Sequence, residues 1–246
     1  MLRHKLVAAL VLGTALIATT LGSATAASTS HAAAPQWPYQ VYRPSTLSKA
    51  HPVPLIVIPT GDINYMVRTT LFNQAADRGG FVVAYAQILK SYNDIAHTQP
   101  DTAANPYPDM LFLSDVIDKV TAAENIDPTR VYMAGFSLGG TMSYRAGCIL
   151  ATKLAGVASV GGVLANANCV PSRPVSLFAV NGTSDPSYAA SAGHWPSAAS
   201  AVDLWKGFDG CAPGTTASTT SGAVSMQTWG SCRSGSVVQF ATIASF

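Results

Sequence analysis

The segment 131–150 most constrains what this chain can fold into. A short apolar stretch, 131–134 (VYMA), runs directly into the box 135–139 (GFSLG), and helix-forming residues follow at once. Small residues on both sides of Ser137 are what a tight, strained turn from a strand into a helix needs. The motif therefore predicts a serine nucleophile at the end of a buried strand, and an ordinary structural turn is the alternative.

Strand and helix signals alternate along most of the chain. Strands are predicted at 54–59, 81–85, 131–134, 156–160, 175–180, 224–229 and 237–243, and helices at 69–78, 110–120, 138–150 and 198–208. Such alternation is typical of βαβ units, so we expect an α/β fold with a mainly parallel, doubly wound sheet. Asp109 is placed to cap the second helix. The polar segment 88–108 predicts a long surface loop, and no repeat or linker interrupts a single domain at 41–246.

The first 26 residues predict export from the cell. A positive start (MLRHK) precedes the uncharged apolar stretch 6–22, and Ala24-Thr25-Ala26 has the small-x-small pattern that precedes signal cleavage. A membrane anchor is the alternative, but the stretch is shorter than the roughly 20 residues of a bilayer span. We therefore expect a signal peptide at 1–26, a flexible lead-in at 27–40, and a secreted, extracellular product with no membrane span.

The charge pattern narrows the classes of partner. Only 11% of the 246 residues are charged, with 14 Lys and Arg against 12 Asp and Glu, whereas 48% are hydrophobic. Because phosphate binding depends on clustered basic side chains, which this sequence lacks, no nucleic acid partner is expected. Neither a CxxC pair nor an HExxH run is present, so we expect no metal and no cofactor.

All four cysteines lie in the second half of the chain, at Cys148, Cys169, Cys211 and Cys232. An even number of cysteines in an exported chain predicts two disulfides. Three pairings are possible, and the order along the sequence favours the two local ones, Cys148 with Cys169 and Cys211 with Cys232.

Three further groups complete a candidate site around the serine. The backbone N–H of Leu138 lies at the helix amino terminus beside the serine oxygen, and the N–H of Asp62, in the turn after the strand 54–59, is the second candidate oxyanion donor. Asp185 follows the strand 175–180, where a triad acid orients a histidine. Ordinary local turns are the alternative roles for both aspartates.

On these residues the sequence resembles the secreted α/β-hydrolase family that contains polyhydroxybutyrate depolymerases, feruloyl esterases and acetylxylan esterases. The matching stretches are 75–84, 109–140, the Cys148 and Cys169 pair, 181–186 (NGTSDP), and Leu204-Trp205 ahead of Cys211 and Cys232. The resemblance implies the α/β-hydrolase fold, Ser137 as nucleophile, Asp185 as triad acid and both disulfides. It also implies a serine esterase that hydrolyses acyl esters of a polymer or its fragments, such as polyhydroxybutyrate or feruloyl- or acetyl-polysaccharide, through an acyl-enzyme.

The chain departs from the family pattern at two places. Thr60-Gly61 stands where the family usually has His-Gly. The family's catalytic histidine lies in a Gly-Gly-His-x-Trp-Pro-like segment after the strand that corresponds to 237–243, close to Phe246. We therefore expect an incomplete carboxyl end, without the final catalytic loop and the helix that covers the last strand.

His194, within Gly193-His194-Trp195-Pro196, is the only one of the five histidines that follows Asp185. It is the candidate base, although it stands early for that role, and a surface-loop histidine is the alternative. Two other functions remain open. One is a catalytically impaired relative that binds a polymer or glycan through Tyr92 and Tyr107, and the other is a secreted serine peptidase.

Overall fold

The computed structural model describes residues 34, 36–88, 108–165, 170–186, 188 and 196–245, all within one compact unit, Ala32–Phe246. The elements, in chain order, are β1 (Tyr39–Tyr42), β2 (Val53–Thr60), α1 (Ile63–Thr69), α2 (Phe72–Gly79), β3 (Val82–Gln87), α4 (Pro108–Glu124), β4 (Ile126–Phe136), α5 (Leu138–Ile149), β5 (Gly156–Val160), β6 (Ser176–Gly182), α6 (Ala198–Asp209), β7 (Ala217–Ser221), β8 (Val224–Trp229) and β9 (Val238–Ile243). In these ranges, no helix is long and apolar enough to cross a membrane.

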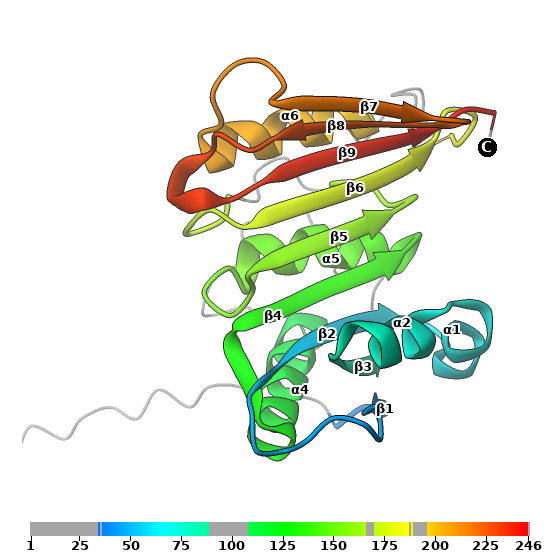
Figure 1. Ribbon diagram of the computed structural model, residues 1–246, viewed down its shortest axis with the longest axis vertical. Helices are drawn as coiled ribbons and strands as arrows, with labels where there is room; N and C mark the ends of the chain where they lie inside the picture. Colours follow the sequence, from blue (N-terminus) through cyan, green and yellow to red (C-terminus); the bar gives the residue numbers. More distant parts are fainter. Residues whose placement is uncertain are drawn as a thin grey trace, which may run out of the picture. The chain divides into compact units, whose positions relative to one another are not determined.

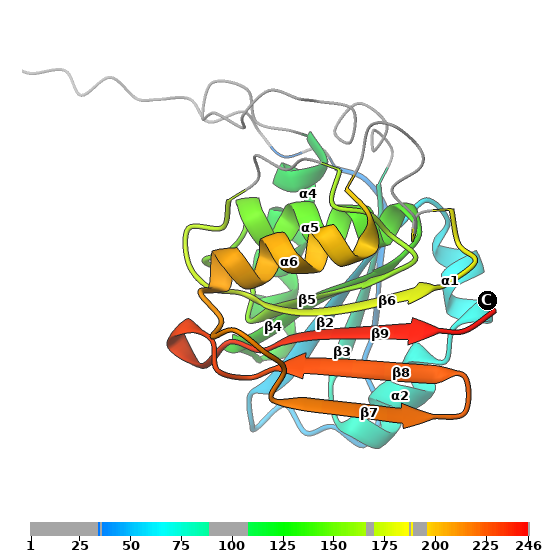
Figure 2. The ribbon, with the colours of Figure 1, turned by 90° about the horizontal axis from the view of Figure 1, so that it is seen from above.

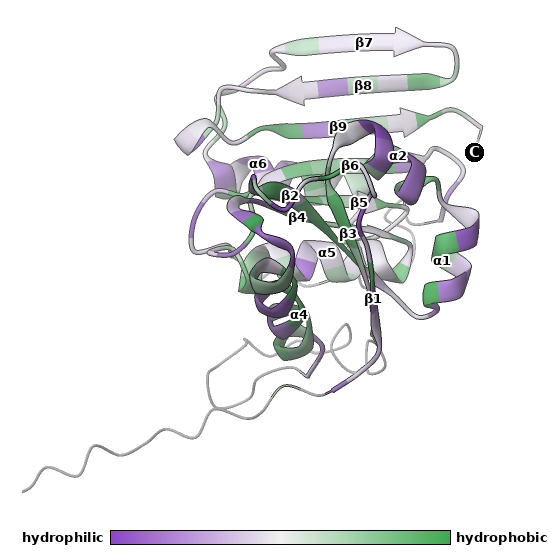
Figure 3. Ribbon diagram, turned by 60° about the horizontal axis from the view of Figure 1, so that its bottom comes forward, coloured by the Kyte–Doolittle hydropathy of each residue, from purple (hydrophilic) through white to green (hydrophobic). Residues whose placement is uncertain are grey.

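The strands form one sheet of order β1-β3-β2-β4-β5-β6-β9-β8-β7 (Figure 1). Its six central strands, β3 to β9 in this order, are parallel, whereas β1 pairs antiparallel with β3 and the hairpin β7–β8 pairs antiparallel with β9. The prediction of a mainly parallel sheet is confirmed. Continuous apolar runs such as VPLIVIPT in β2 suit strands that are covered on both faces, and Figure 3 shows the central strands as the most hydrophobic part of the sheet.

Helices α4, α5 and α6 cover one face of the sheet, and α1 and α2 lie on the other (Figures 1 and 2). Trp205 anchors α6, because its side chain is fully buried and its indole N–H donates to the carbonyl of Val175 at 2.7 Å. Gly147 of α5 permits this close packing, since an added Cβ would lie 2.7 Å from the Trp205 ring. The covered face is therefore a closely packed core.

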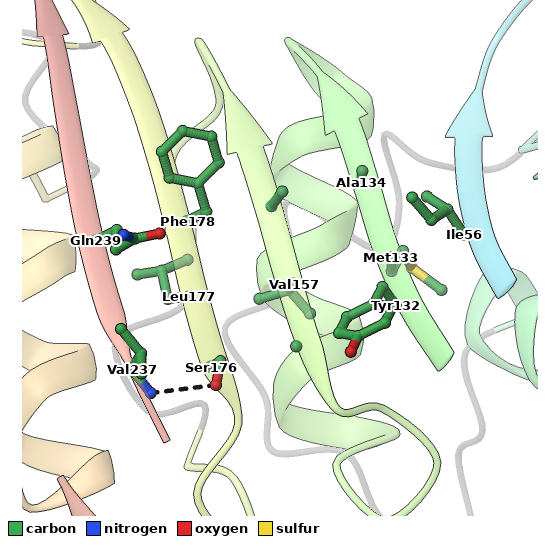
Figure 4. Close-up of a pocket in the computed structure, with 12 residues that line it drawn as sticks. Ile56, Tyr132, Met133, Ala134, Val157, Ser176, Leu177, Phe178, Val237 and Gln239 are labelled. Atoms are coloured by element: carbon green, nitrogen blue, oxygen red, sulfur yellow. Dashed lines mark hydrogen bonds between the residues drawn. The ribbon is translucent and has the colours of Figure 1, made fainter. Parts of the chain in front are cut away.

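The other face of β4, β5 and β6 is open to solvent. Phe136 is 54% exposed, Val160 41%, Phe178 39% and Tyr132 37%. Figure 4 shows Tyr132 and Phe178 over a shallow, uncharged pocket of about 290 Å³ that reaches from Ile56 on β2 to β9. Open apolar surface therefore lies over β4, β5 and β6. It is not confined to the last strand, which the sequence predicts to lack a covering helix.

Several element boundaries differ from prediction. The helix expected at 69–78 corresponds to α2, which begins later because the backbone is extended at Thr70. A separate helix, α1, ends just before Thr70 and was not predicted. β1 begins at Tyr39, inside the expected lead-in, because its backbone pairs with β3. Asp109 is buried within the first turn of α4 rather than preceding the helix as a cap. The missed strand β7 (ASTTS) is exposed at every position, so no apolar alternation marks it.

β4 starts five residues earlier than the predicted strand. Asp127 holds this early part in place, because its carboxylate accepts hydrogen bonds from the Thr129 N–H at 2.9 Å and hydroxyl at 2.7 Å and from Arg130 Nε at 2.7 Å. These bonds, the Thr129 hydroxyl first, lower the pKa of Asp127 to about 2. Asp127 is therefore ionised at neutral pH, and its carboxylate holds the first residues of β4 together.

Candidate active site

Ser137 occupies a sharp turn between β4 and α5. Its backbone has φ 53° and ψ −117°, a conformation that a residue with a side chain rarely adopts. The Ser137 N–H donates to the carbonyl of Val160, at the end of the adjacent strand β5, at 2.7 Å. The serine is exposed. The local fold therefore holds a serine in a strained position at the carboxyl edge of the sheet.

The glycines of the GFSLG box are required by packing. A Cβ added at Gly135 would lie 2.1 Å from the backbone of Gly139, and one added at Gly139 would lie 2.3 Å from the carbonyl oxygen of Pro59. Both contacts are with backbone, which cannot swing aside as a flexible side chain does. The box thus closes the turn on itself and brings the start of α5 against the end of β2.

This contact places the turn 60–62 beside the turn that carries Ser137. Leu138 is the first residue of α5, where a backbone N–H has no partner within the helix. The N–H of Asp62 donates to the Thr60 hydroxyl at 3.1 Å. In this conformation it is not free to bind a substrate oxyanion. The Asp62 carboxylate caps α1 by accepting from the Tyr65 N–H at 3.0 Å. Thr60 is therefore a neighbour of the candidate donor that sequence reasoning did not assign.

Asp185 lies after β6, on the far side of β5 from the serine. Its Oδ2 atom is 3.3 Å from the position that a Cβ of Gly161 would take, and Gly161 has φ +61°. Gly161 directly follows Val160, which holds the Ser137 N–H. Since β4, β5 and β6 are neighbours, the serine and the carboxylate follow strands that are about 10 Å apart. Both residues therefore lie at the carboxyl edge of the same part of the sheet.

A base for Ser137 is not identified among the described residues. His194 lies outside them, as do Tyr92 and Tyr107, so their predicted roles stay predictions. His51 is described, but it is exposed and precedes β2, at the edge of the sheet opposite Ser137. Its position agrees with its exclusion by chain order.

Sequence comparison relates the chain to esterases. The model of the phospholipase/carboxylesterase family matches residues 91–189. A bifunctional acetylxylan esterase/xylanase from Neocallimastix patriciarum is 35% identical over 148 residues, which are 59% of this chain and 21% of the relative. Feruloyl esterase B from Piromyces equi is 39% identical over 82 residues, which are 31% of this chain and 15% of the relative. The chain thus spans about a fifth or less of these two relatives.

Structural comparison decides the fold. An acetyl xylan esterase from Aspergillus awamori superimposes with a TM-score of 0.61 at 13% identity, over 84% of this chain and 88% of the other. The chain has the α/β-hydrolase fold. In this fold, Ser137 follows a parallel strand and precedes a helix, as a nucleophile elbow does, and Asp185 follows a later strand.

The cysteines agree with the local pairing as far as they are described. Cys211 and Cys232 form a disulfide across 21 residues, which joins the end of α6 to the end of β8. Cys148 is also disulfide-bonded. Its predicted partner, Cys169, lies outside the described residues, so the Cys148–Cys169 pairing stays a prediction.

Sequence reasoning did not assign two residues that lie next to the candidate site. Gly161 leaves space for the Asp185 carboxylate at the end of β5, and the Thr60 hydroxyl accepts a hydrogen bond from the Asp62 N–H. The Gly161-Gly162 pair directly after a predicted strand was the available signal for the first. The substitution of Thr60 for the family's histidine was the signal for the second.

Proposed function

We propose that this α/β-hydrolase is a secreted serine esterase that hydrolyses acyl esters carried by a polysaccharide or its fragments. The strained backbone of Ser137, beside the glycine that admits the Asp185 carboxylate, is the observation that carries the proposal. The activities for which the two esterase relatives are named supply the substrate class. Export is supported by the amino-terminal pattern and by the Cys211–Cys232 disulfide.

In the proposed reaction, Ser137 Oγ attacks the ester carbonyl and gives its proton to the base, for which His194 is the candidate. The oxyanion that forms is stabilised by the Leu138 N–H and the positive end of the α5 dipole. A second donor, the Asp62 N–H, becomes available only when it leaves the Thr60 hydroxyl. The alcohol departs with the proton from the base, and water then hydrolyses the acyl-enzyme. Asp185 orients the imidazole and stabilises its charged form.

A second candidate is a catalytically impaired relative that binds the polymer without cleaving it. One observation favours it, because His194 is the only histidine that follows Asp185 in the sequence and it stands early for the role of the base. Binding would then depend on the surfaces around an inactive elbow.

Hydrolysis of p-nitrophenyl acetate and labelling by a fluorophosphonate separate these candidates. We expect the wild type to hydrolyse the ester, and Ser137→Ala to lose more than about a thousandfold in kcat and all labelling. Ser221→Ala, an exposed serine on β7, is the matched control and keeps both. Labelling that persists in Ser137→Ala contradicts the nucleophile, whereas labelling of the wild type without turnover favours the impaired relative.

His194→Ala assigns the base in the same assay. If His194 takes the proton from Ser137, we expect turnover to fall by orders of magnitude while the fold and its melting temperature are retained. An unchanged rate contradicts its role. Esters of ferulic, acetic and 3-hydroxybutyric acids, compared by kcat/KM, then identify the acyl group.

A further inference from the structure

A groove of about 560 Å³ lies between α6 and one face of β7, β8 and β9. Its volume is within the range of about 300–1,000 Å³ that is usual for ligand sites. The strands contribute four hydroxyl groups and one amide to its lining, from Ser218, Thr220, Ser225, Thr242 and Gln227. The mechanism proposed above uses none of these side chains.

The strand register explains why these side chains share one side of the sheet. Thr220, Ser225 and Thr242 lie directly opposite one another on β7, β8 and β9, and Ser218 lies opposite Gln227. Side chains of directly paired residues, and of residues two apart on a strand, point to the same face. The hydroxyls of Thr220 and Ser225 are 3.2 Å apart. Two short cross-strand rows of hydrogen-bonding groups thus form the floor of the groove.

The groove carries little net charge. Asp203 and Lys206 are the charged residues that line it, and they pair with each other at 2.6 Å. Lys206 Nζ also lies 4.3 Å from the centre of the Trp229 ring, so its charge is engaged within the wall. An ionic ligand would find no unpaired charge among these lining residues. The lining therefore suits a neutral ligand with many hydroxyl groups.

The remaining lining is aromatic and aliphatic. Tyr188 is the partly exposed aromatic residue of the groove, whereas Phe240 and Trp229, which also line it, are each only 7% exposed. A pyranose ring has hydroxyls at its rim and C–H groups on its faces, so it matches hydroxyl and amide partners combined with an aromatic surface. We propose that this groove binds a neutral polysaccharide chain. The inference deepens the proposed function and rests on it for the link between binding and ester cleavage.

One loop links the groove to the candidate active site. The Tyr188 N–H donates to the Asp185 carbonyl at 2.9 Å, so one loop carries both a groove residue and the proposed triad acid. From β8 to β4, which leads to Ser137, there are four strand spacings, or about 19 Å. A ligand that reaches both places must be an oligosaccharide, because a single sugar is too short.

Calorimetric titration of Ser137→Ala with unesterified xylohexaose tests the groove. We expect saturable binding, and we expect Ser225→Ala combined with Gln227→Ala to raise Kd by about tenfold or more. Both side chains are exposed, so the fold should be retained, which circular dichroism checks. Thr219→Ala with Ser221→Ala is the matched control, because these exposed residues lie on the opposite face of the same hairpin. It should leave Kd unchanged.

Two outcomes overturn the proposal. One is absence of xylohexaose binding, and the other is an equal Kd in the groove variant and the control. A hexagalacturonate that binds more tightly than xylohexaose also contradicts a site for neutral sugars. Because the titration involves no turnover, failure of the esterase assay leaves this result intact, and an active esterase that binds no xylohexaose refutes the groove alone.

Discussion

Gly139→Ala should move Ser137, the proposed nucleophile, away from the turn 60–62. Residue 139 is the point at which α5 touches β2, because a Cβ there would lie 2.3 Å from the Pro59 carbonyl oxygen. Ser137 stands two residues before this contact, and Thr60 stands one residue after Pro59. Any relief of the clash therefore moves the serine relative to the turn 60–62.

The size of the movement follows from the contact. Ordinary van der Waals contact begins at 3.4 Å, so the helix start and the strand end must part by about 1 Å. A misplacement of about 1 Å costs on the order of a hundredfold in rate. Overpacking of a close contact costs about 1–3 kcal/mol of stability, so we expect a folded protein with a lowered melting temperature.

The assay measures the rate of fluorophosphonate labelling at Ser137 together with the melting temperature. Gly207→Ala on α6 is the control, since an added Cβ there has no neighbour within 4 Å. It should keep the labelling rate and gain up to about 1 kcal/mol from helix propensity. A folded Gly139→Ala variant that labels at the wild-type rate would refute the argument that this contact positions the serine.

Three other perturbations test the fold around the site. Replacing Cys211 and Cys232 by serine should lower the free energy of unfolding by about 3 kcal/mol in denaturant titration, and peptide mapping that pairs either cysteine elsewhere contradicts the disulfide. Burial raises the pKa of Asp209, so its stabilising effect is present at low pH and is lost as pH rises through that pKa. Asp209→Asn should therefore raise the melting temperature more at pH 7 than at pH 3, and an equal change at both would contradict the sign. Phe178→Lys, on the open sheet face, should reduce self-association in light scattering, and Val160→Lys should do the same. Unchanged scattering in both would show that this face does not drive association.

The parallel centre of the fold was predictable because buried strands have a distinct composition. β2 and β3 appear as short apolar runs, and strands covered on two faces have no polar alternation to obscure them. β7 could not be found in this way. Its residues are all exposed, and it exists because its backbone pairs with β8, which is a property of the tertiary structure.

The candidate site was predictable where the backbone itself imposes residue types. Because residue 139 lies against Pro59, only glycine fits there without a clash, and this requirement is visible in the sequence. The hydrogen bond from the Asp62 N–H to the Thr60 hydroxyl leaves none, because it depends on how one side chain is rotated. The approach of Asp185 to Gly161 joins two loops that are distant in the chain, so local patterns do not contain it.

Among the described strands, β7 ends the sheet on one side, and none of them pairs with the half of its backbone that faces away from β8. An open row of this kind is a template on which another chain can add a strand, with aggregation as the result. Here the row is only five residues long and carries serine and threonine at four of them. A stacked copy would gain few hydrogen bonds and hardly any apolar contact from it. The polar hairpin is therefore a poor template for the addition of another strand at this edge of the sheet.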